Sequence, residues 1–274
     1  MDSLGEKVFH PNGVRWAGIV VYGWFLVNLA SLLPHMNLLW GTDAVIMRGA
    51  GGDGLLENFM YQLVYRPQRA TAILALHACS ALLAMFSFRW VFIARITVWI
   101  TGLMLYFAAY PAFNSGFLAM LLFSFFLIPA YARATHPVRI FLTNGMWFAC
   151  VVQLVLIYAI SAGYKWTGEQ WISGSALYYT FSIDHFSRPW ISAFLDGNQW
   201  LWKCLTWAIL LYQSVFPFVA WVKKWRIKLV LTGIVFHLAI ATFMGLWMFG
   251  FAMIAAYVFL LPEQYFLFRE RLKS

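Results

Sequence analysis

The chain has 274 residues, of which 63% are hydrophobic and only 11% are charged. A soluble domain has about 45–50% apolar and about 25% charged residues. This composition therefore excludes a soluble enzyme, a nucleic-acid-binding domain and a disordered region, and it predicts a polytopic membrane protein.

Eight stretches of the chain are apolar and approach the roughly 20 residues that a helix needs to cross the bilayer core. In chain order they are Val14–Leu33, Ala70–Phe88, Trp90–Ala109, Gly116–Ala132, Phe141–Ala162, Trp200–Val222, Lys228–Gly245 and Leu246–Leu261. The last two meet at Gly245 with almost no loop, so a count of seven, ending in one long broken helix, is the alternative. We predict an all-α bundle of about eight transmembrane helices, organised as one domain over residues 1–274. The first helix is expected to be retained, because no small-residue cleavage site follows it.

The basic residues predict how the bundle is oriented. With eight helices and the N-terminus inside, thirteen Lys and Arg residues lie on the inner side and six on the outer side. Since an excess of Lys and Arg marks cytoplasmic loops, both termini are predicted to be cytoplasmic. A count of seven would place the basic tail Arg269–Lys273 outside, against the same rule. The predicted location is a cell membrane, with the lipid bilayer as the first partner.

The formal net charge of +9 is explained in the same way. Lys and Arg gather between apolar segments, where they fix the topology and contact anionic lipid head groups. No basic stripe alternates with exposed aromatic residues, so no nucleic-acid partner is predicted. The three cysteines, Cys79, Cys150 and Cys204, are predicted to be unpaired thiols packed between helices, because their number is odd and none forms a CxxC pair.

Two of the predicted loops are long, Pro34–Arg69 and Gly163–Gln199, and both are external in this topology. The second loop is rich in Trp, Tyr and Phe, which gather at membrane interfaces. We therefore predict a short interfacial helix from Ser175 to Ile183.

Ionisable residues at membrane depth are costly, so each of them is a candidate for function. Lys165 is the most informative, because it follows an apolar helix and lies among Tyr164, Trp166 and Trp171, with Glu169 four residues on. Burial disfavours the charged ammonium, so a neutral amine could serve here as a base. The alternative is a lysine that extends to the outer head groups and pairs with Glu169.

His237 and His77 lie midway along their predicted helices. A single intramembrane His usually forms a hydrogen bond with a neighbouring helix, as Gln153, Gln213, Asn28 and Asn114 are also expected to do. If the two histidines lie at a similar depth and face each other, they could instead ligate a haem. Arg95 is interpreted either as a residue that extends to the inner head groups or as the partner of a buried acid. The acids outside the termini are all in predicted external loops: Asp43, Asp53, Glu57, Glu169, Asp184 and Asp196.

Two stretches resemble a known membrane family. Residues 153–179 read QLVLIYAISAGYKWTGEQWISGSALYY, and residues 237–253 read HLAIATFMGLWMFGFAM. They are similar to the Gln, Tyr, Gly, Lys, Trp and Gly pattern, and to the later His, Gly, Phe and Met pattern, of the HTTM (horizontally transferred transmembrane) family. That family includes the membrane module of vitamin K-dependent gamma-carboxylase. It also includes a small bacterial branch with the membrane protein that helps to mature the sporulation-delaying peptide toxin.

The resemblance implies a site and a function. Lys165, counted from Gln153 and Tyr158, matches the base that deprotonates a hydroquinone, and His237 matches a His near the same external pocket. Glu169 would then tune Lys165, and His237 would orient or shuttle a proton. Tyr158, Trp166 and Trp171 would bind the cofactor, a quinone, and no metal site is expected. Carboxylation itself is not expected, since 274 residues hold no counterpart of the carboxylase's large extramembrane domain.

The resemblance thus implies a multi-pass HTTM-type protein of a bacterial inner membrane. It would act with other membrane or exported proteins in the modification or maturation of an exported peptide or protein. The first alternative is a non-enzymatic integral subunit or scaffold of a larger envelope complex. The second is a haem-bearing electron carrier that uses His77 and His237.

Overall fold

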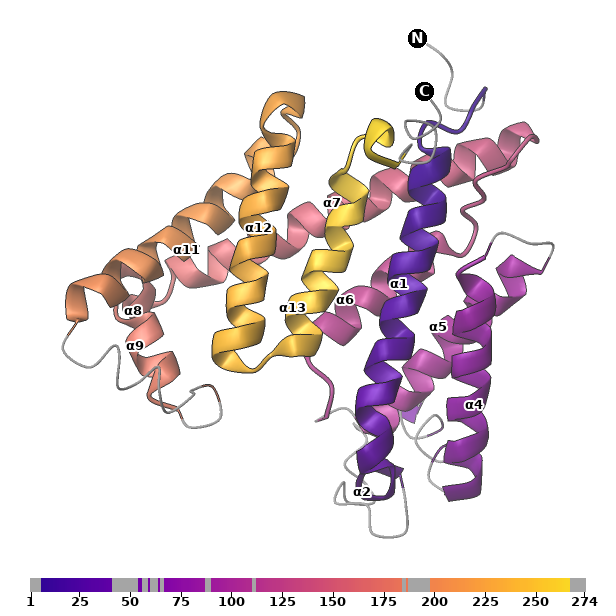
Figure 1. The fold of residues 1–274 in the computed structure, drawn as a ribbon, viewed down its shortest axis with the longest axis horizontal. Coiled ribbons are helices and arrows are strands. Elements are labelled where there is room, and N and C mark those ends of the chain that lie inside the picture. Colours follow the sequence, from indigo (N-terminus) through magenta and orange to yellow (C-terminus); the bar gives the residue numbers. More distant parts are fainter. Residues whose placement is uncertain are drawn as a thin grey trace, which may run out of the picture. The chain divides into compact units, whose positions relative to one another are not determined.

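The computed structural model describes residues 6–40, 67–86, 90–109, 112–183 and 198–266, together with the single positions 54, 55, 59, 64 and 186. In this described part all regular structure is helical and no strand occurs, which confirms the predicted all-α class (Figure 1). The chain divides into two compact units, one of Met1–Ala149 with Pro262–Ser274 and one of Cys150–Leu261. Helix α7 passes from the first unit into the second, and the single domain predicted from the sequence stays a prediction.

A helix occupies each of the eight predicted apolar segments. The first unit contains α1 (Pro11–Leu32), η1 (Leu33–His35), α2 (Met36–Trp40), α4 (Pro67–Ala84), α5 (Val91–Ala108), α6 (Ser115–Leu127), the first part of α7 (Pro137–Trp166) and η5 (Glu263–Phe266). The second unit contains the rest of α7, then α8 (Glu169–Ile172), α9 (Ala176–Phe181), α11 (Gln199–Val219), α12 (Lys223–Met244), α13 (Trp247–Ala256) and η4 (Tyr257–Leu260).

Within the part of the chain that the structure describes, four helical segments are long and apolar enough to cross a membrane: Pro11–Trp40, Val91–Ala108, Pro137–Trp166 and Lys223–Met244. Two shorter apolar helices, Ser115–Leu127 and Trp247–Leu260, lie between or after them. The predicted total of eight crossings and the predicted cytoplasmic termini therefore stay predictions.

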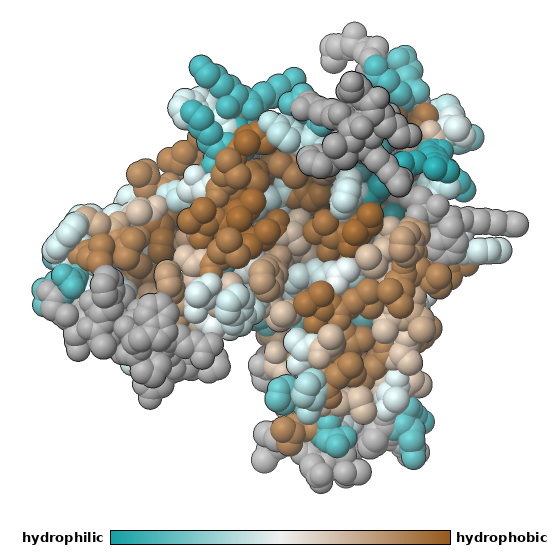
Figure 2. All heavy atoms as spheres, viewed as in Figure 1, coloured by the Kyte–Doolittle hydropathy of each residue, from teal (hydrophilic) through white to brown (hydrophobic). Residues whose placement is uncertain are grey.

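The surface of these helices supports a lipid environment. Along α12, Leu231 and Val235 expose 58% and 69% of their surface, and hydrophobic residues gather on the middle of the visible side of this helix (Figure 2). Large apolar side chains exposed in a row favour a non-aqueous neighbour over water.

Local sequence signals explain where several helices begin and end. Pro11 stands at the start of α1, where the missing N–H costs nothing. Asn114 caps α6 by accepting a hydrogen bond from the Gly116 N–H at 2.9 Å. Gly245 ends α12 with a φ of 70°, a left-handed conformation that favours glycine, and α13 follows after Leu246. The predicted break at Gly245 is therefore confirmed, as is the short helix in the aromatic loop, which is α9.

The three cysteines are free, as predicted, but their placement differs from the prediction. Only Cys150 is buried between helices, whereas Cys79 and Cys204 are exposed. An apolar stretch predicts that a residue lies on a helix, but not which face of that helix is covered.

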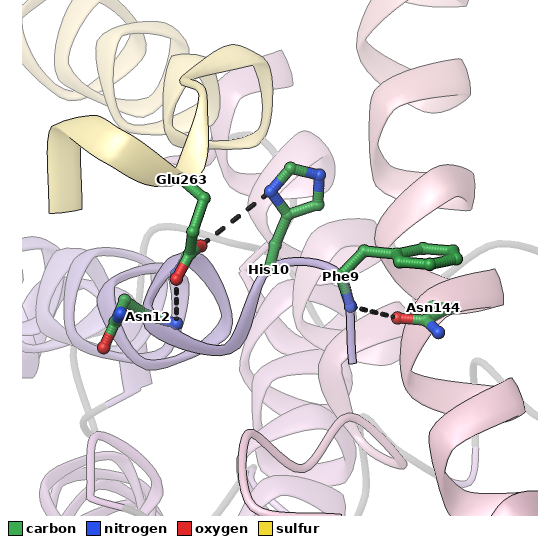
Figure 3. A network of polar contacts seen from close by, with 6 residues as sticks. Phe9, His10, Asn12, Asn144 and Glu263 are labelled. Atoms are coloured by element: carbon green, nitrogen blue, oxygen red, sulfur yellow. Dashed lines mark hydrogen bonds and ion pairs between the residues drawn. The ribbon is translucent and has the colours of Figure 1, made fainter. Parts of the chain in front are cut away.

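The start of α1 is held by residues from distant parts of the first unit (Figure 3). The Glu263 carboxylate accepts hydrogen bonds from the Asn12 N–H at 2.8 Å and the Gly13 N–H at 3.1 Å, and it lies 3.8 Å from His10 Nδ1. Asn144 on α7 accepts a bond from the Phe9 N–H at 3.0 Å. The residue at the N-cap position, His10, makes no side-chain cap of its own. Glu263 therefore satisfies the free N–H groups of the first turn and places a negative charge at the positive end of the helix.

Candidate functional site

Three polar side chains share one face of α7 in the second unit: Tyr158, Ser161 and Lys165. Residues spaced by three, four and seven lie on the same side of an α-helix. Helix α11 covers this face with Gln213 and Phe216, both of which are buried.

Lys165 is half-buried, and no acid of the described residues pairs with its amine. Its Nζ donates to Ser161 Oγ at 2.8 Å, and Ser161 Oγ donates onward to Gln213 Oε1 at 3.1 Å. The Nζ also lies 4.8 Å from the centre of the Trp171 ring, which is within cation–π range. Lys165 and Trp171, which the sequence analysis assigns to one site, therefore lie next to each other.

Glu169 and Trp166 lie apart from this arrangement. Glu169 is exposed in the first turn of α8, and no ion pair joins it to Lys165 among the described residues. The pairing considered for an interfacial lysine is therefore absent. Trp166 is 55% exposed, and its Nε1 donates to Ser214 Oγ on α11 at 2.9 Å.

A second polar cluster lies deeper along the same helices. The hydroxyl of Tyr158 contacts His237 Nε2 on α12 at 2.7 Å and also forms a hydrogen bond with the Tyr257 hydroxyl on η4. Tyr257 in turn contacts the Tyr212 hydroxyl at 3.1 Å, and Tyr212 donates to the Leu229 carbonyl at 3.3 Å. Tyr158, Tyr257 and His237 are at most 2% exposed. The ring of Phe216 stacks on Tyr158 with centroids 3.7 Å apart.

The number of available protons fixes the direction of each hydrogen bond in the series that runs from the Leu229 carbonyl to His237. A carbonyl can only accept, so Tyr212 donates its proton to Leu229. Each phenol has one proton, so the bond between Tyr212 and Tyr257 must be donated by Tyr257. For the same reason the bond between Tyr257 and Tyr158 is donated by Tyr158. The remaining bond then requires His237 to donate from Nε2–H to Tyr158. A neutral imidazole carries one N–H, so His237 Nδ1 holds a bare lone pair. This Nδ1 is buried and has no hydrogen-bond partner among the described residues.

Replacing Tyr257 with Phe is expected to reverse the tautomer of His237. The Tyr257 hydroxyl accepts the Tyr158 proton, so without it Tyr158 is expected to donate to His237 Nε2 instead, and the imidazole proton then moves to Nδ1. Nitrogen NMR of histidine-labelled protein, assigned with a His237→Gln variant, measures which nitrogen carries the proton. Tyr178→Phe, at an exposed tyrosine of α9, is the control and leaves the tautomer unchanged. A protonated Nδ1 in the wild-type protein would contradict the bond directions.

Sequence reasoning identified Tyr158 and His237 but missed Tyr212 and Tyr257. The available signal was a glycine in α12: a Cβ at Gly233 would collide with the Tyr257 and Tyr212 hydroxyls. Gly233 therefore makes room for the phenols, which approach the α12 backbone one turn from the Leu229 carbonyl.

His77 lies in the first unit. Its Nδ1 is 2.8 Å from Thr101 Oγ1, and that hydroxyl donates its own proton to the Thr97 carbonyl at 2.6 Å. His77 therefore donates from Nδ1, which is the bond to a neighbouring helix that the sequence predicted for a single intramembrane His. Haem ligation by His77 and His237 stays a prediction, since the two residues belong to different units.

Arg95 fits neither of its two sequence interpretations. It is 2% exposed, and its Nη1 donates to the carbonyl of Leu127, the last residue of α6, at 2.7 Å and to the carbonyl of Ala130, three residues later. Its guanidinium lies 5.6 Å from the centre of the Tyr22 ring. The last carbonyls of a helix have no partners within the helix and carry a partial negative charge. Arg95 therefore caps α6 from α5 and needs no acid.

Comparison with protein-family models, with curated proteins and with solved structures finds no match for this chain. The described residues contain no group of three or more His, Cys, Asp or Glu side chains placed to hold a metal ion.

Proposed function

We propose that this chain is a multi-pass membrane protein of the HTTM type in which Lys165 acts as a base toward a lipid-soluble hydroquinone. It works with other membrane or exported proteins in the modification or maturation of an exported peptide or protein. The observation that carries the proposal is the Lys165 amine, which is held by Ser161 and Trp171 and forms no ion pair with a carboxylate of the described residues.

The residues around Lys165 fit such a ligand. When bound, a hydroquinone supplies a phenolic proton that an amine can accept. Lys165 takes that proton on its nitrogen lone pair and becomes an ammonium, which the Trp171 ring then stabilises. Ser161 and Gln213 hold the nitrogen in place before and after the transfer.

The deeper cluster supports the same proposal. Tyr158 lies seven residues before Lys165 on α7, about 10 Å along the helix axis and on the same face. His237, with its bare Nδ1, is the second proton acceptor of the unit. With eight crossings and cytoplasmic termini, Lys165 lies at the outer face, where an exported substrate arrives.

Mass spectrometry of a solvent extract from the gently solubilised, purified protein tests the proposal. The wild-type protein is expected to carry quinone, and Lys165→Ala is expected to retain up to roughly tenfold less, because the hydrogen bond of a neutral amine to the ligand is worth about 0.5–1.5 kcal/mol. Lys165→Arg retains the donor but cannot act as a base, so it binds quinol without deprotonating it, which ultraviolet absorption measures. Lys228→Ala is the control, since Lys228 also lies over an indole, that of Trp225 at 4.6 Å.

Other results of these measurements would favour the scaffold subunit or the haem-bearing electron carrier. Quinone retained in Lys165→Ala, or phospholipid alone in the wild-type extract, overturns the role of Lys165. Stoichiometric co-purification with other subunits in that case supports the scaffold. Haem bands in a reduced-minus-oxidised spectrum support the electron carrier.

A further inference from the structure

A pocket of about 710 Å³ lies in the first unit and shares no lining residue with the arrangement around Lys165. It opens where α5 begins, α6 ends and α7 begins. Its walls are mainly apolar and include Trp90, Phe92, Ile128, Pro129 and Leu142, and one cation, Arg139, lines it. Because Val91–Ala108 and Pro137–Trp166 are both candidate membrane crossings, the pocket lies at the end of two such segments.

No acid among the residues that the structure describes pairs with the cation in this pocket. Arg139 is exposed, and its guanidinium forms no hydrogen bond or ion pair with any described residue. Between Glu57 and Glu169 the sequence contains seven Lys and Arg residues and no Asp or Glu. An anion that pairs with Arg139 therefore has to come from outside this part of the chain.

The apolar wall of the pocket is fixed in place. Arg95 binds the Leu127 and Ala130 carbonyls on either side of Ile128 and Pro129, so the segment that follows α6 is tied to α5. Trp90 and Phe92 are 55% and 51% exposed beside it. Indole rings gather at the boundary between head groups and acyl chains.

We propose that this pocket binds one anionic phospholipid, with its phosphate at Arg139 and the start of an acyl chain against Phe92, Ile128 and Leu142. Basic pockets between membrane helices are known sites for anionic head groups. The apolar walls favour a lipid over a free anion, since they add contact area that inorganic phosphate lacks. The site is separate from Lys165 and does not depend on the proposed function.

Thermal unfolding of the full-length protein in a neutral detergent tests the site, with dioleoyl phosphatidylglycerol and dioleoyl phosphatidylcholine as probes. Phosphatidylglycerol is expected to raise the unfolding temperature in a saturable way, and phosphatidylcholine of the same chains is expected to do so much less. In Arg139→Gln the half-saturating concentration of phosphatidylglycerol rises about fivefold, the effect of one basic residue at a lipid surface. Arg15→Gln, at an exposed arginine of α1 outside the pocket, retains the wild-type response.

Each remaining result overturns the site. An equal loss in Arg15→Gln would show that the response comes from general surface charge. Equal stabilisation by phosphatidylcholine would show that Arg139 does not bind the anionic head group. Competition by millimolar inorganic phosphate, with no requirement for an acyl chain, would show that the pocket takes a free anion. If Arg139→Gln changes the unfolding temperature without lipid, native mass spectrometry of bound phosphatidylglycerol in the same variants gives the comparison.

Discussion

Replacing Arg95 with Met is expected to lower the unfolding temperature in detergent by roughly 6–12 °C, which corresponds to about 3 kcal/mol. Methionine fills much of the volume of arginine but donates no hydrogen bond. The Ala130 carbonyl then loses the Arg95 donor, and the Leu127 carbonyl retains only the backbone hydrogen bond from the Ala130 N–H at 3.1 Å. An unpaired buried carbonyl costs about 1–3 kcal/mol, and a lost hydrogen bond to a charged group costs about 1.5–3 kcal/mol. The removal of a buried guanidinium offsets part of this loss.

Two further variants test whether the effect at Arg95 comes from its hydrogen bonds. Arg95→Lys retains a charged donor and is expected to recover part of the loss, whereas a purely steric role for Arg95 predicts no difference between Lys and Met. Arg15→Met, at an exposed position of α1, is expected to stay within about 0.5 kcal/mol of the wild type. An unchanged unfolding temperature in Arg95→Met would show that Arg95 does not cap α6.

Replacing Gly233 with Ala is expected to destabilise the second unit by about 1–3 kcal/mol or more, the usual cost of an added methyl group in a packed interior. The new Cβ would occupy the space of the Tyr257 and Tyr212 hydroxyls, so the rings have to move and the chain of hydrogen bonds to His237 is broken. Circular dichroism during heating measures the loss, and the nitrogen spectrum of His237 is expected to change with it.

The matched control is another helical glycine of the same unit. A Cβ at Gly163 on α7 would meet no atom within 4 Å. Gly163→Ala should therefore stabilise the protein by up to about 1 kcal/mol, because Ala is the better helix former. Similar destabilisation by both substitutions would show that the phenol cluster is not the reason for the glycine at 233.

The positions of the helices could be predicted from the sequence, because a helix long enough to cross a membrane corresponds to one continuous apolar stretch. The break at Gly245 and the short helix α9 were predictable for the same local reason. The partners of Arg95 were not, since backbone carbonyls are present at every residue and leave no mark in the sequence. Tyr212 and Tyr257 meet across 45 residues, and each alone is an ordinary aromatic residue of an apolar helix. Whether Lys165 would lie beside Glu169 or beside Trp171 was equally undetermined, because the turn at Gly168 decides it.

The Glu263 carboxylate binds the N–H of Asn12, a residue 251 positions earlier in the chain. At a synthesis rate of about 5–20 residues per second, α1 exists for roughly 13–50 s before this carboxylate has been made. Until Glu263 has been synthesised, the N–H groups of the first turn of α1 lack the carboxylate that binds them in the folded protein. The structure around the start of α1 is therefore completed long after α1 itself has been made.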